Sequence, residues 1–446
     1  MRLLKIKFLG LAFLISTISF AQLPSKVLVG YWENWGNLRL KDVDDRYNVL
    51  CLSFLEADKT YPATPFDNIV SDLEFVPSNN TTLKADIPIV QSEGKKVLIS
   101  IGGGNGSFRL NNTTDKTTFV TKVKDFIIEY GVDGIDIDLE QKTYVCATSN
   151  SAAKINTPTD VHITNLIDGI KEIMVWYQNK YSKKMILTMA PETAYVNGGL
   201  SNWTVTNSCG GHYLAIIEQL RDEIDLLMVQ LYNSGSILDL NGTEQFESSV
   251  DFVLSATEAI IKGFTAKGGL GTYSGLPEEK VVVGLTTCAS DQAVRTRSEI
   301  VSIMNYLLGV GSKPGSYTLR DSYPNLKGLM TWSINTDARM SSMNSCNPSV
   351  SYDFAQAFED VFGTIDNSIQ TLKIESLKVY PNPTTGILTI NSEDLIGENF
   401  TLTDLNGKIV FSFKATEKLT KIDLSNYSNG FYTLKSKNNL TKVIIR

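Results

Sequence analysis

The chain has 446 residues, 42% of them hydrophobic and 20% charged, which suits a globular protein with one large domain and one small one. Its formal charge of −7 argues against nucleic acid or an anionic membrane surface as a partner. Because His162 and His212 are the only histidines, His-rich zinc sites are excluded and a Ser-His-Asp triad is disfavoured, which leaves carboxylate chemistry.

The first 21 residues have the pattern of a secretory signal. Arg2, Lys5 and Lys7 precede an apolar run over residues 8–18, and a small-x-small cleavage pattern ends at Ala21. The alternative, a membrane-spanning helix, needs about 20 apolar residues, which neither this run nor any later segment supplies. We therefore expect a signal peptide over residues 1–21 and export of the chain.

Eight short apolar or β-branched runs follow, separated by stretches with helical periodicity. They begin at Lys26, Val49, Lys96, Gly134, Met185, Leu226, Lys280 and Gly328. Strands that alternate with helices in this way predict an α/β fold, a (β/α)8 TIM barrel over residues 22–363. A doubly wound open sheet is the alternative, but the glycine-rich stretches at Gly102 and Gly268 both lack the GxGxxG spacing of its phosphate-binding loop.

The fourth run, "DGIDIDLE", carries acids at alternate positions. In a strand, Asp136, Asp138 and Glu140 project to one side and the intervening isoleucines and leucine to the other. In a barrel the apolar side faces the helices, so the acids line the interior and approach the C-terminal mouth, where such folds build active sites.

These acids should share protons. Neighbours about 6.6 Å apart along the strand repel by roughly 2.5 kcal/mol at an effective dielectric near 20, or about two pKa units. At least one should therefore stay protonated near neutral pH, as a general acid for a glycosidic oxygen requires. Glu140, the longest side chain and the nearest to the mouth, is the expected donor. A water-exposed polar face or a calcium cluster are the alternatives; the apolar counter-face opposes exposure, and no acidic Gly-centred loop accompanies the acids.

The five cysteines show no CxxC or metal-ligand spacing. Cys51 lies in an apolar run and is expected to be a small core residue. Cys146, Cys209 and Cys346 lie in expected loops, where export would permit a bridge, although the pairing stays open.

After residue 363 the pattern of apolar and polar residues changes. Residues 364–374 form a polar connector, and residues 375–446 alternate apolar and polar positions without helical runs, which predicts a small all-β sandwich. Asn406-Gly407 joins two alternating runs as a type I′ hairpin turn would.

"DGIDIDLE" resembles the DxxDxDxE signature of glycoside hydrolase family 18, the chitinases and related endo-β-N-acetylglucosaminidases. "SIGGG" at Ser100 resembles the SxGG of that family's preceding strand. "VGYWENWG", "LTMAPE", "MVQLYN" and "GLMTWS" follow where the family places substrate contacts, so that the likeness covers roughly residues 25–362.

The resemblance implies hydrolysis without an enzyme nucleophile, because the substrate's own acetamido oxygen attacks the anomeric carbon. It implies that Glu140 is the general acid and then the base, that Asp138 orients the acetamido group, and that Asp136 shares a proton with Asp138. Asp133 would support the site structurally, and Tyr232 would donate to the acetamido oxygen. No metal or cofactor is implied.

Substrate contacts are also implied. Trp332 resembles the aromatic floor beneath the distorted sugar, with a barrel-core tryptophan as the alternative. The remaining matches are Tyr31 as a subsite tyrosine, Met228 packing near Tyr232, and Gln230 and Asn233 as polar contacts. Gly102 and Gly103 are interpreted chiefly as a close backbone approach, with Gly103 kept among the substrate contacts. Trp32, Trp35 and Trp203 are open between sugar platform and loop packing.

Chitinases with tunnel-like clefts carry an inserted α+β domain between the seventh and eighth strands. Only about 40 residues separate these strands here, so we expect an open groove and endo-type, weakly processive cleavage.

"VYPNPTTGILTI" from Val379, with the closing "LTKVIIR", resembles the C-terminal sorting domain of type IX secretion substrates. The alternative is a carbohydrate-binding sandwich, but this segment has few aromatics and no tryptophan. The expected protein is a secreted, monomeric chitinase whose partners are chitin oligosaccharides and the type IX machinery. An endoglycosidase acting on N-glycans and a non-hydrolytic sugar-binding barrel are the rivals; the second typically lacks the acid at Glu140.

Overall fold

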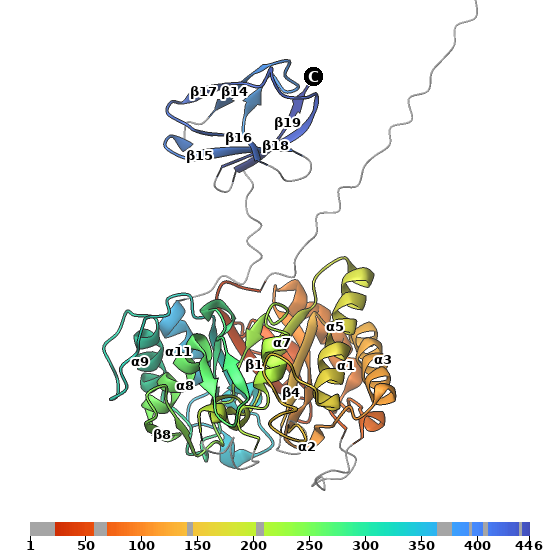
Figure 1. The fold of residues 1–446 in the computed structure, drawn as a ribbon, viewed down its shortest axis with the longest axis vertical. Helices are drawn as coiled ribbons and strands as arrows, with labels where there is room; N and C mark the ends of the chain where they lie inside the picture. Colours follow the sequence, from red (N-terminus) through yellow and green to blue (C-terminus); the bar gives the residue numbers. More distant parts are fainter. Residues whose placement is uncertain are drawn as a thin grey trace, which may run out of the picture. The chain divides into compact units, whose positions relative to one another are not determined.

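The computed structural model describes residues 23–57, 69–140, 146–201, 209–363, 377–391, 395–404, 409–436 and 439–446. These residues form two compact units, one reaching Gly363 and the other starting at Leu377 (Figure 1). The expected signal peptide over residues 1–21, the connector over residues 364–374, Trp203 and the Asn406-Gly407 turn lie outside the described residues.

The first unit is a barrel of eight parallel strands, ordered β11-β12-β1-β2-β3-β4-β5-β6. Parallel bridges between Leu227 and Val281 and between Gln230 and Gly284 join the two ends of this order. The strands are β1 Val27–Glu33, β2 Val49–Leu55, β3 Lys96–Gly102, β4 Gly134–Leu139, β5 Ile186–Met189, β6 Leu226–Leu227, β11 Val282–Thr286 and β12 Gly328–Trp332. All eight predicted runs form strands, and the predicted TIM barrel is confirmed.

Helices surround the strands (Figure 1). The α-helices are α1 Asn80–Ser92, α2 Gly103–Gly106, α3 Thr113–Tyr130, α5 Val161–Tyr181, α6 Thr193–Val196, α7 Leu214–Gln219, α8 Val250–Lys262, α9 Arg297–Leu307, α10 Ile334–Asp337 and α11 Asp353–Phe362. The short 3-10 helices are η1 Leu40–Asp42, η2 Val70–Asp72, η3 Asn197–Leu200, η5 Glu278–Lys280 and η6 Asn344–Cys346. Local sequence sets several ends: a Thr296/Glu299 capping box opens α9, and Gly131 at φ 68° ends α3. No helix among the described residues is long and apolar enough to cross a bilayer.

The strands are buried on both faces, which explains their nearly continuous apolar runs. Ile135 and Ile137 of β4 belong to the large apolar cluster between the strands and the helices. Tyr31 and Met228 belong to a smaller cluster inside the barrel. Cys51 lies in that inner cluster and forms no disulfide, so its predicted core role is confirmed.

The connection between β6 and β11 contains two hairpins that were not predicted from the sequence. They are β7 Ser236–Leu238 with β8 Glu244–Phe246, and β9 Phe264–Ala266 with β10 Gly271–Tyr273. By contrast, residues 287–327, which are described throughout, contain only the helix α9 between β11 and β12. The expected absence of an α+β insertion between these strands is therefore seen.

The second unit is all-β. One sheet has the order β13-β14-β17 and the other β16-β15-β18-β19, all antiparallel. The strands are β13 Val379–Tyr380, β14 Ile387–Asn391, β15 Asn399–Thr403, β16 Ile409–Lys414, β17 Leu419–Asp423, β18 Gly430–Ser436 and β19 Asn439–Ile445. Leu388 and Ile390 from the first sheet share one apolar core with Phe400 and Leu434 from the second, which makes the predicted sandwich.

Candidate active site

Asp136 is held inside the barrel by three hydroxyl groups. It is 0% exposed and accepts hydrogen bonds from Tyr31 Oη at 2.7 Å, Ser100 Oγ at 2.7 Å and Thr188 Oγ1 at 2.6 Å. Burial raises the pKa of Asp136, and the three donors oppose that rise by stabilising the charged form. The three donors come from β1, β3 and β5, so the hydrogen bonds of Asp136 join β4 to these three strands inside the barrel.

Asp138 and Glu140 are bridged by one amide. Gln230 Nε2 lies 2.8 Å from Asp138 Oδ1, 3.0 Å from Glu140 Oε1 and 3.0 Å from the Ala190 carbonyl oxygen. The amide has only two N–H bonds for these three acceptors. Gln230 therefore brings the two carboxyl groups together. The sequence predicted that Asp138 and Glu140 lie on the same side of the strand, but it did not predict this bridge.

Both carboxyl groups are biased toward the protonated form. Burial raises the pKa of Glu140 to about 7, the charge of Glu192 adds to the rise, and the Gln230 hydrogen bond opposes it. The pKa of Asp138 is raised well above its usual range by burial and then by the charges of Glu140 and Asp136. The site therefore holds a proton near neutral pH, in reach of the barrel mouth, as a general acid requires.

The donors around the acids also bear on the calcium alternative. Hydroxyl and amide hydrogens point at Asp136 and Asp138, where a cation would need free oxygen lone pairs. Among the residues with described positions, no group of three or more His, Cys, Asp or Glu is arranged to hold a metal ion.

A glycine-rich turn fixes the end of β4. Gly102 has φ 114°, and a Cβ there would lie 2.4 Å from the Asp138 carbonyl oxygen; Gly103 has φ 77°, and its Cβ would lie 2.8 Å from the Phe54 ring. Ser107 Oγ donates to the Gly103 carbonyl oxygen at 3.1 Å and accepts from the Glu140 backbone N–H at 2.8 Å. This is the predicted close backbone approach. A substrate contact by Gly103 stays a prediction.

An aromatic wall, defined here as Tyr31, Trp35, Phe54 and Trp332, stands beside the acids. The Trp332 and Phe54 rings stack at 5.5 Å with an interplanar angle of 14°, and Trp35 lies 6.3 Å from Trp332. Trp332 is partly buried and Trp35 is 42% exposed, so the wall has an open side. Tyr31 is 1% exposed, and its hydroxyl donates to Asp136. Its contact with substrate stays a prediction.

The remaining predicted contacts lie on or after the sixth strand. Tyr232 is 7% exposed, and burial followed by the charges of Asp138 and Glu140 raises its pKa, which keeps the phenol protonated. Its hydroxyl makes no hydrogen bond to any residue that the structure describes, so it is available as a donor. Met228 is fully buried in the inner cluster, and Asn233 is exposed with φ 52°. Their contacts with substrate stay predictions.

Asp133 lies at the opposite end of β4. Its Oδ2 accepts from Gln91 Nε2 at 2.9 Å and from the Val97 backbone N–H at 3.1 Å, and Lys183 Nζ lies 3.4 Å from Oδ1. These contacts join α1, β3 and β4 away from the mouth. They support the structural role that the resemblance implied.

Sequence reasoning missed Thr188, Glu192 and Phe54. Thr188 and Glu192 both lie in "LTMAPE", and applying the period of two to that strand as well would have placed them beside the acids. Phe54 escapes such a pattern, because a register shift between Leu52 and Leu55 turns it into the barrel. Trp32 packs in the outer cluster with its indole N–H on the Leu38 carbonyl oxygen, which is loop packing.

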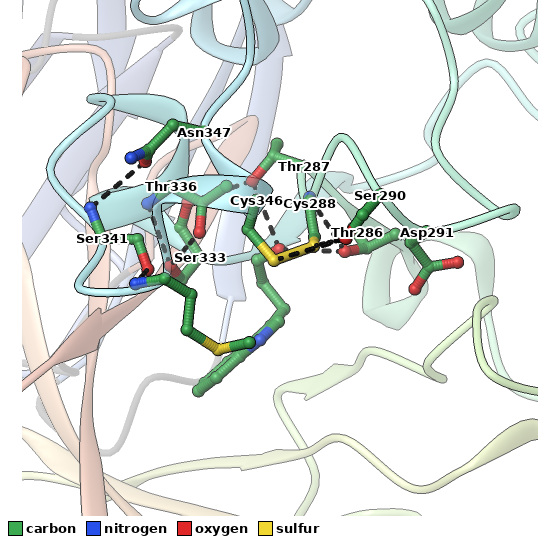
Figure 2. The surroundings of a disulfide bond; sticks show 12 residues. Thr286, Thr287, Cys288, Ser290, Asp291, Ser333, Thr336, Ser341, Cys346 and Asn347 are labelled. Atoms are coloured by element: carbon green, nitrogen blue, oxygen red, sulfur yellow. Dashed lines mark hydrogen bonds between the residues drawn. A yellow bond between two sulfur atoms is a disulfide. The ribbon is translucent and has the colours of Figure 1, made fainter.

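Two disulfides join loops at the mouth. Cys146 pairs with Cys209, which links the segment after β4 to the segment before α7. Cys288 pairs with Cys346, which links the loop after β11 to the loop after β12 (Figure 2). Thr287, next to Cys288, donates its backbone N–H to the Trp332 carbonyl oxygen at 2.9 Å. The second bridge therefore restrains the backbone that carries Trp332.

The charge of Glu192 leads to a prediction on pH. Since Glu192 raises the pKa of Glu140, Glu192→Gln should lower it from about 7 toward the ordinary glutamate value. The resemblance implies that Glu140 is the general acid, and on that assignment the alkaline limb of the rate against pH should then move to lower pH. Initial rates between pH 4 and 9 measure the shift. Glu172→Gln, at an exposed pair with Lys124, is the matched control and should leave the limb in place; an unmoved or alkaline-shifted limb for Glu192→Gln would contradict the prediction.

Comparison with known proteins identifies both units. Residues 27–298 match the sequence model of Glycosyl hydrolases family 18, and residues 378–446 match that of the Secretion system C-terminal sorting domain.

Individual relatives agree with these matches. Chitinase D of Niallia circulans is 38% identical over 328 residues, which cover 70% of this chain and 59% of that protein. Chitinase ChiA of Flavobacterium johnsoniae is 33% identical over 404 residues, 86% of this chain and 24% of its own length. A family GH18 chitinase from Chromobacterium violaceum has a structure with a TM-score of 0.60 at 28% identity, covering 77% of this chain and 85% of that one. This chain thus spans less than two thirds of the curated relatives named here. Because the family model matches more than half of the residues, over seven of the eight barrel strands and with the acidic strand among them, the chain belongs to glycosyl hydrolases family 18.

Proposed function

We propose that the protein is a secreted chitinase that hydrolyses β-1,4 bonds between N-acetylglucosamine units with retention of configuration. The observation that carries the proposal is the Asp138–Gln230–Glu140 arrangement, in which one amide bridges the buried carboxyl group of Asp138 and the partly buried one of Glu140, whose pKa is raised to about 7. Relatives of similar sequence are named chitinases, and the wall of Trp35, Phe54 and Trp332 offers apolar faces to sugar rings.

The first step would use the substrate as its own nucleophile. Glu140 gives its proton to the glycosidic oxygen while the acetamido oxygen attacks the anomeric carbon, which forms an oxazolinium ion and releases the leaving sugar. Asp138 would accept the acetamido N–H and stabilise the developing positive charge. The Tyr232 hydroxyl would donate to the acetamido oxygen and hold it in line.

The second step would reverse the proton flow. Glu140, now ionised, takes a proton from water, which attacks the anomeric carbon from the side of the departed sugar and opens the oxazolinium ring. A pKa of about 7 suits a group that must act first as an acid and then as a base near neutral pH. Asp136 and Asp138 would share one proton. The three hydroxyl donors oppose the rise of the Asp136 pKa, so the proton rests on Asp138, and it would pass to Asp136 as the positive charge develops, which leaves Asp138 ionised.

We further propose that cleavage is endo-type. The support is the short connection between β11 and β12, which contains α9 and no domain that could wall the groove. An open groove admits the middle of a polymer, whereas a tunnel must be threaded from an end.

Product analysis tests the proposal. Wild-type enzyme should cleave N-acetylglucosamine hexamers at internal bonds and release β-anomers first, as read by NMR within the first minutes. Glycoproteins with N-linked glycans serve as the comparison substrate. Cleavage of the N-glycan core with intact chitin oligomers would point to an endoglycosidase, binding without cleavage to a sugar-binding barrel, and dimers released only from chain ends would contradict the endo mode.

The C-terminal unit would direct export through the type IX machinery and leave the enzyme outside the cell or on its surface. The match of residues 378–446 to a sorting domain supports this role.

Deleting residues 375–446 should therefore leave kcat and KM on chitin oligomers within about twofold and trap the enzyme in the periplasm. Cell fractionation with activity assays measures both. Normal export together with lost chitin binding would instead assign the unit as a carbohydrate-binding module.

A further inference from the structure

Glu33 is a buried carboxylate at the mouth that the proposed mechanism does not use. It is the last residue of β1, two positions after Tyr31, and is 3% exposed. Its carboxylate accepts from two hydroxyl groups of the segment after β12: Ser333 Oγ on Oε1 and, at 3.3 Å, Ser341 Oγ on Oε2. Burying a carboxylate is costly unless it is fully hydrogen-bonded, so its presence here calls for a role.

The backbone of Glu33 begins the turn that carries Trp35. The Gly36 N–H donates to the Glu33 carbonyl oxygen at 3.1 Å, which places Trp35 inside a four-residue turn. Asn335 holds the same turn from the other side, because its Oδ1 accepts the Glu33 N–H at 2.8 Å. A Cβ at Gly36 would lie 2.2 Å from Asn335 Nδ2, so the two segments are in close contact.

The hydroxyl donors of Glu33 come from the segment that follows Trp332. Ser333 is adjacent to Trp332 in sequence, and Ser341 lies in the loop that the Cys288–Cys346 bridge closes; Figure 2 shows both serines beside this bridge. Glu33 therefore joins the turn of Trp35 to the segment of Trp332. Burial raises the pKa of Glu33, and donors that include the Ser333 and Ser341 hydroxyls and the Trp35 indole oppose the rise.

We propose that Glu33, together with Asn335, is a positioning residue that fixes Trp35 beside Trp332 and so sets the shape of the aromatic wall along which a sugar chain binds. The proposal rests on the proposed function for its substrate, a β-1,4-linked N-acetylglucosamine chain. The indole separation of 6.3 Å at 44° is the geometry that these hydrogen bonds maintain. Trp35 is 42% exposed, so the neighbouring Phe54 and Trp332 rings cover only part of its indole.

A double-mutant cycle tests the proposal. Glu33→Ala and Trp35→Ala should each raise KM for the chitin hexamer about tenfold with kcat changed by less than about threefold, and the double variant should show no further rise. Glu33→Gln keeps an acceptor for the serine hydroxyls and should restore KM to within about twofold. If Glu33→Ala does not fold, Glu33→Asp replaces it, because the side chain is shorter by one methylene and the carboxylate moves away from the serine hydroxyls. Glu33→Asp should raise KM at least about threefold when Trp35 is present and should not raise it when combined with Trp35→Ala.

Glu258→Gln is the control for stability alone. Glu258 is equally buried but lies on α8 and is satisfied by the hydroxyls of Tyr317 and Tyr323. It should lower the midpoint of thermal unfolding and leave KM unchanged.

A second readout needs no substrate. The two neighbouring indoles should give a near-ultraviolet circular dichroism signal that Trp35→Ala removes, that Glu33→Ala removes equally and that Glu33→Gln retains. If wild-type enzyme neither binds nor cleaves chitin oligomers, the proposed function fails while this signal still tests the positioning role. Three results would overturn the proposal. They are a KM of the double variant that equals the product of the two single rises, an unchanged KM in Glu33→Ala, and a dichroism signal that Glu33→Ala does not change.

Discussion

Glu140→Gln should lower kcat on chitin oligomers by about 10³-fold and leave oligomer binding within about threefold of wild type. The amide keeps the size of the side chain and an acceptor for the Gln230 N–H, but its own N–H is far too weak an acid to protonate the glycosidic oxygen. Initial rates at pH 6 measure the loss, and calorimetric titration with the tetramer measures binding. Hydrolysis at more than about a tenth of the wild-type rate would remove Glu140 from its assigned role.

The same variant should be more stable than wild type in alkaline solution. Burial raises the folded-state pKa of Glu140 from 4.5 to about 7, so the folded protein retains a proton that the unfolded chain has lost in this interval. Stability is therefore lost as pH rises from 4.5 through 7, by on the order of 3 kcal/mol once both pKa values are passed. Glutamine does not titrate and avoids this loss. Denaturant unfolding at pH 4 and pH 8 should show a gain for Glu140→Gln at the higher pH, and a loss there would show that the inactivity reflects a damaged fold.

Asp138→Asn should lower kcat by about 10²-fold. The asparagine can still accept the Gln230 N–H through its oxygen, so the geometry is kept, but the negative charge that would stabilise an oxazolinium ion is gone. Rates on chitin oligomers and on partly deacetylated oligomers measure the effect, and wild-type enzyme should require an acetylated sugar on the non-reducing side of the cleaved bond.

Asp133→Asn is the matched control, the same change in the same acidic segment. Asp133 contacts Gln91, Val97 and Lys183 at the far end of β4 and should affect stability with kcat within about twofold of wild type. A loss below about fivefold for Asp138→Asn, or equal losses for the two variants, would contradict a charge-stabilising role for Asp138.

Periodicity alone predicted the barrel correctly. All eight strands begin at or within two residues of the predicted runs, because parallel strands buried on both faces must be apolar along their whole length. The period of two along a strand predicted the side of β4 on which its acids lie. Carboxylates at every second position all project to one side of the strand, which in this barrel is the interior. The all-β unit followed from its alternating pattern and its hairpins.

The partners of these acids were not predictable from their own strand. Gln230 reaches Asp138 and Glu140 from 90 residues or more along the chain, and Thr188 reaches Asp136 from 52 residues away. Phe54 points into the mouth only because the pairing of β2 with β3 shifts register near it. The cysteine pairs were equally open, since several pairings are compatible with five scattered residues.

The sequence by itself determined the strand order along the chain, the face on which the acids lie and the need for a shared proton, because local alternation and like-charge repulsion depend on neighbours in sequence. Only the tertiary structure decided which amide bridges the carboxyl groups of Asp138 and Glu140, which hydroxyls satisfy Asp136 and which serine hydroxyls Glu33 accepts from. Those contacts arise from barrel closure, which brings the ends of distant strands to one mouth, and no local pattern encodes which side chains meet there.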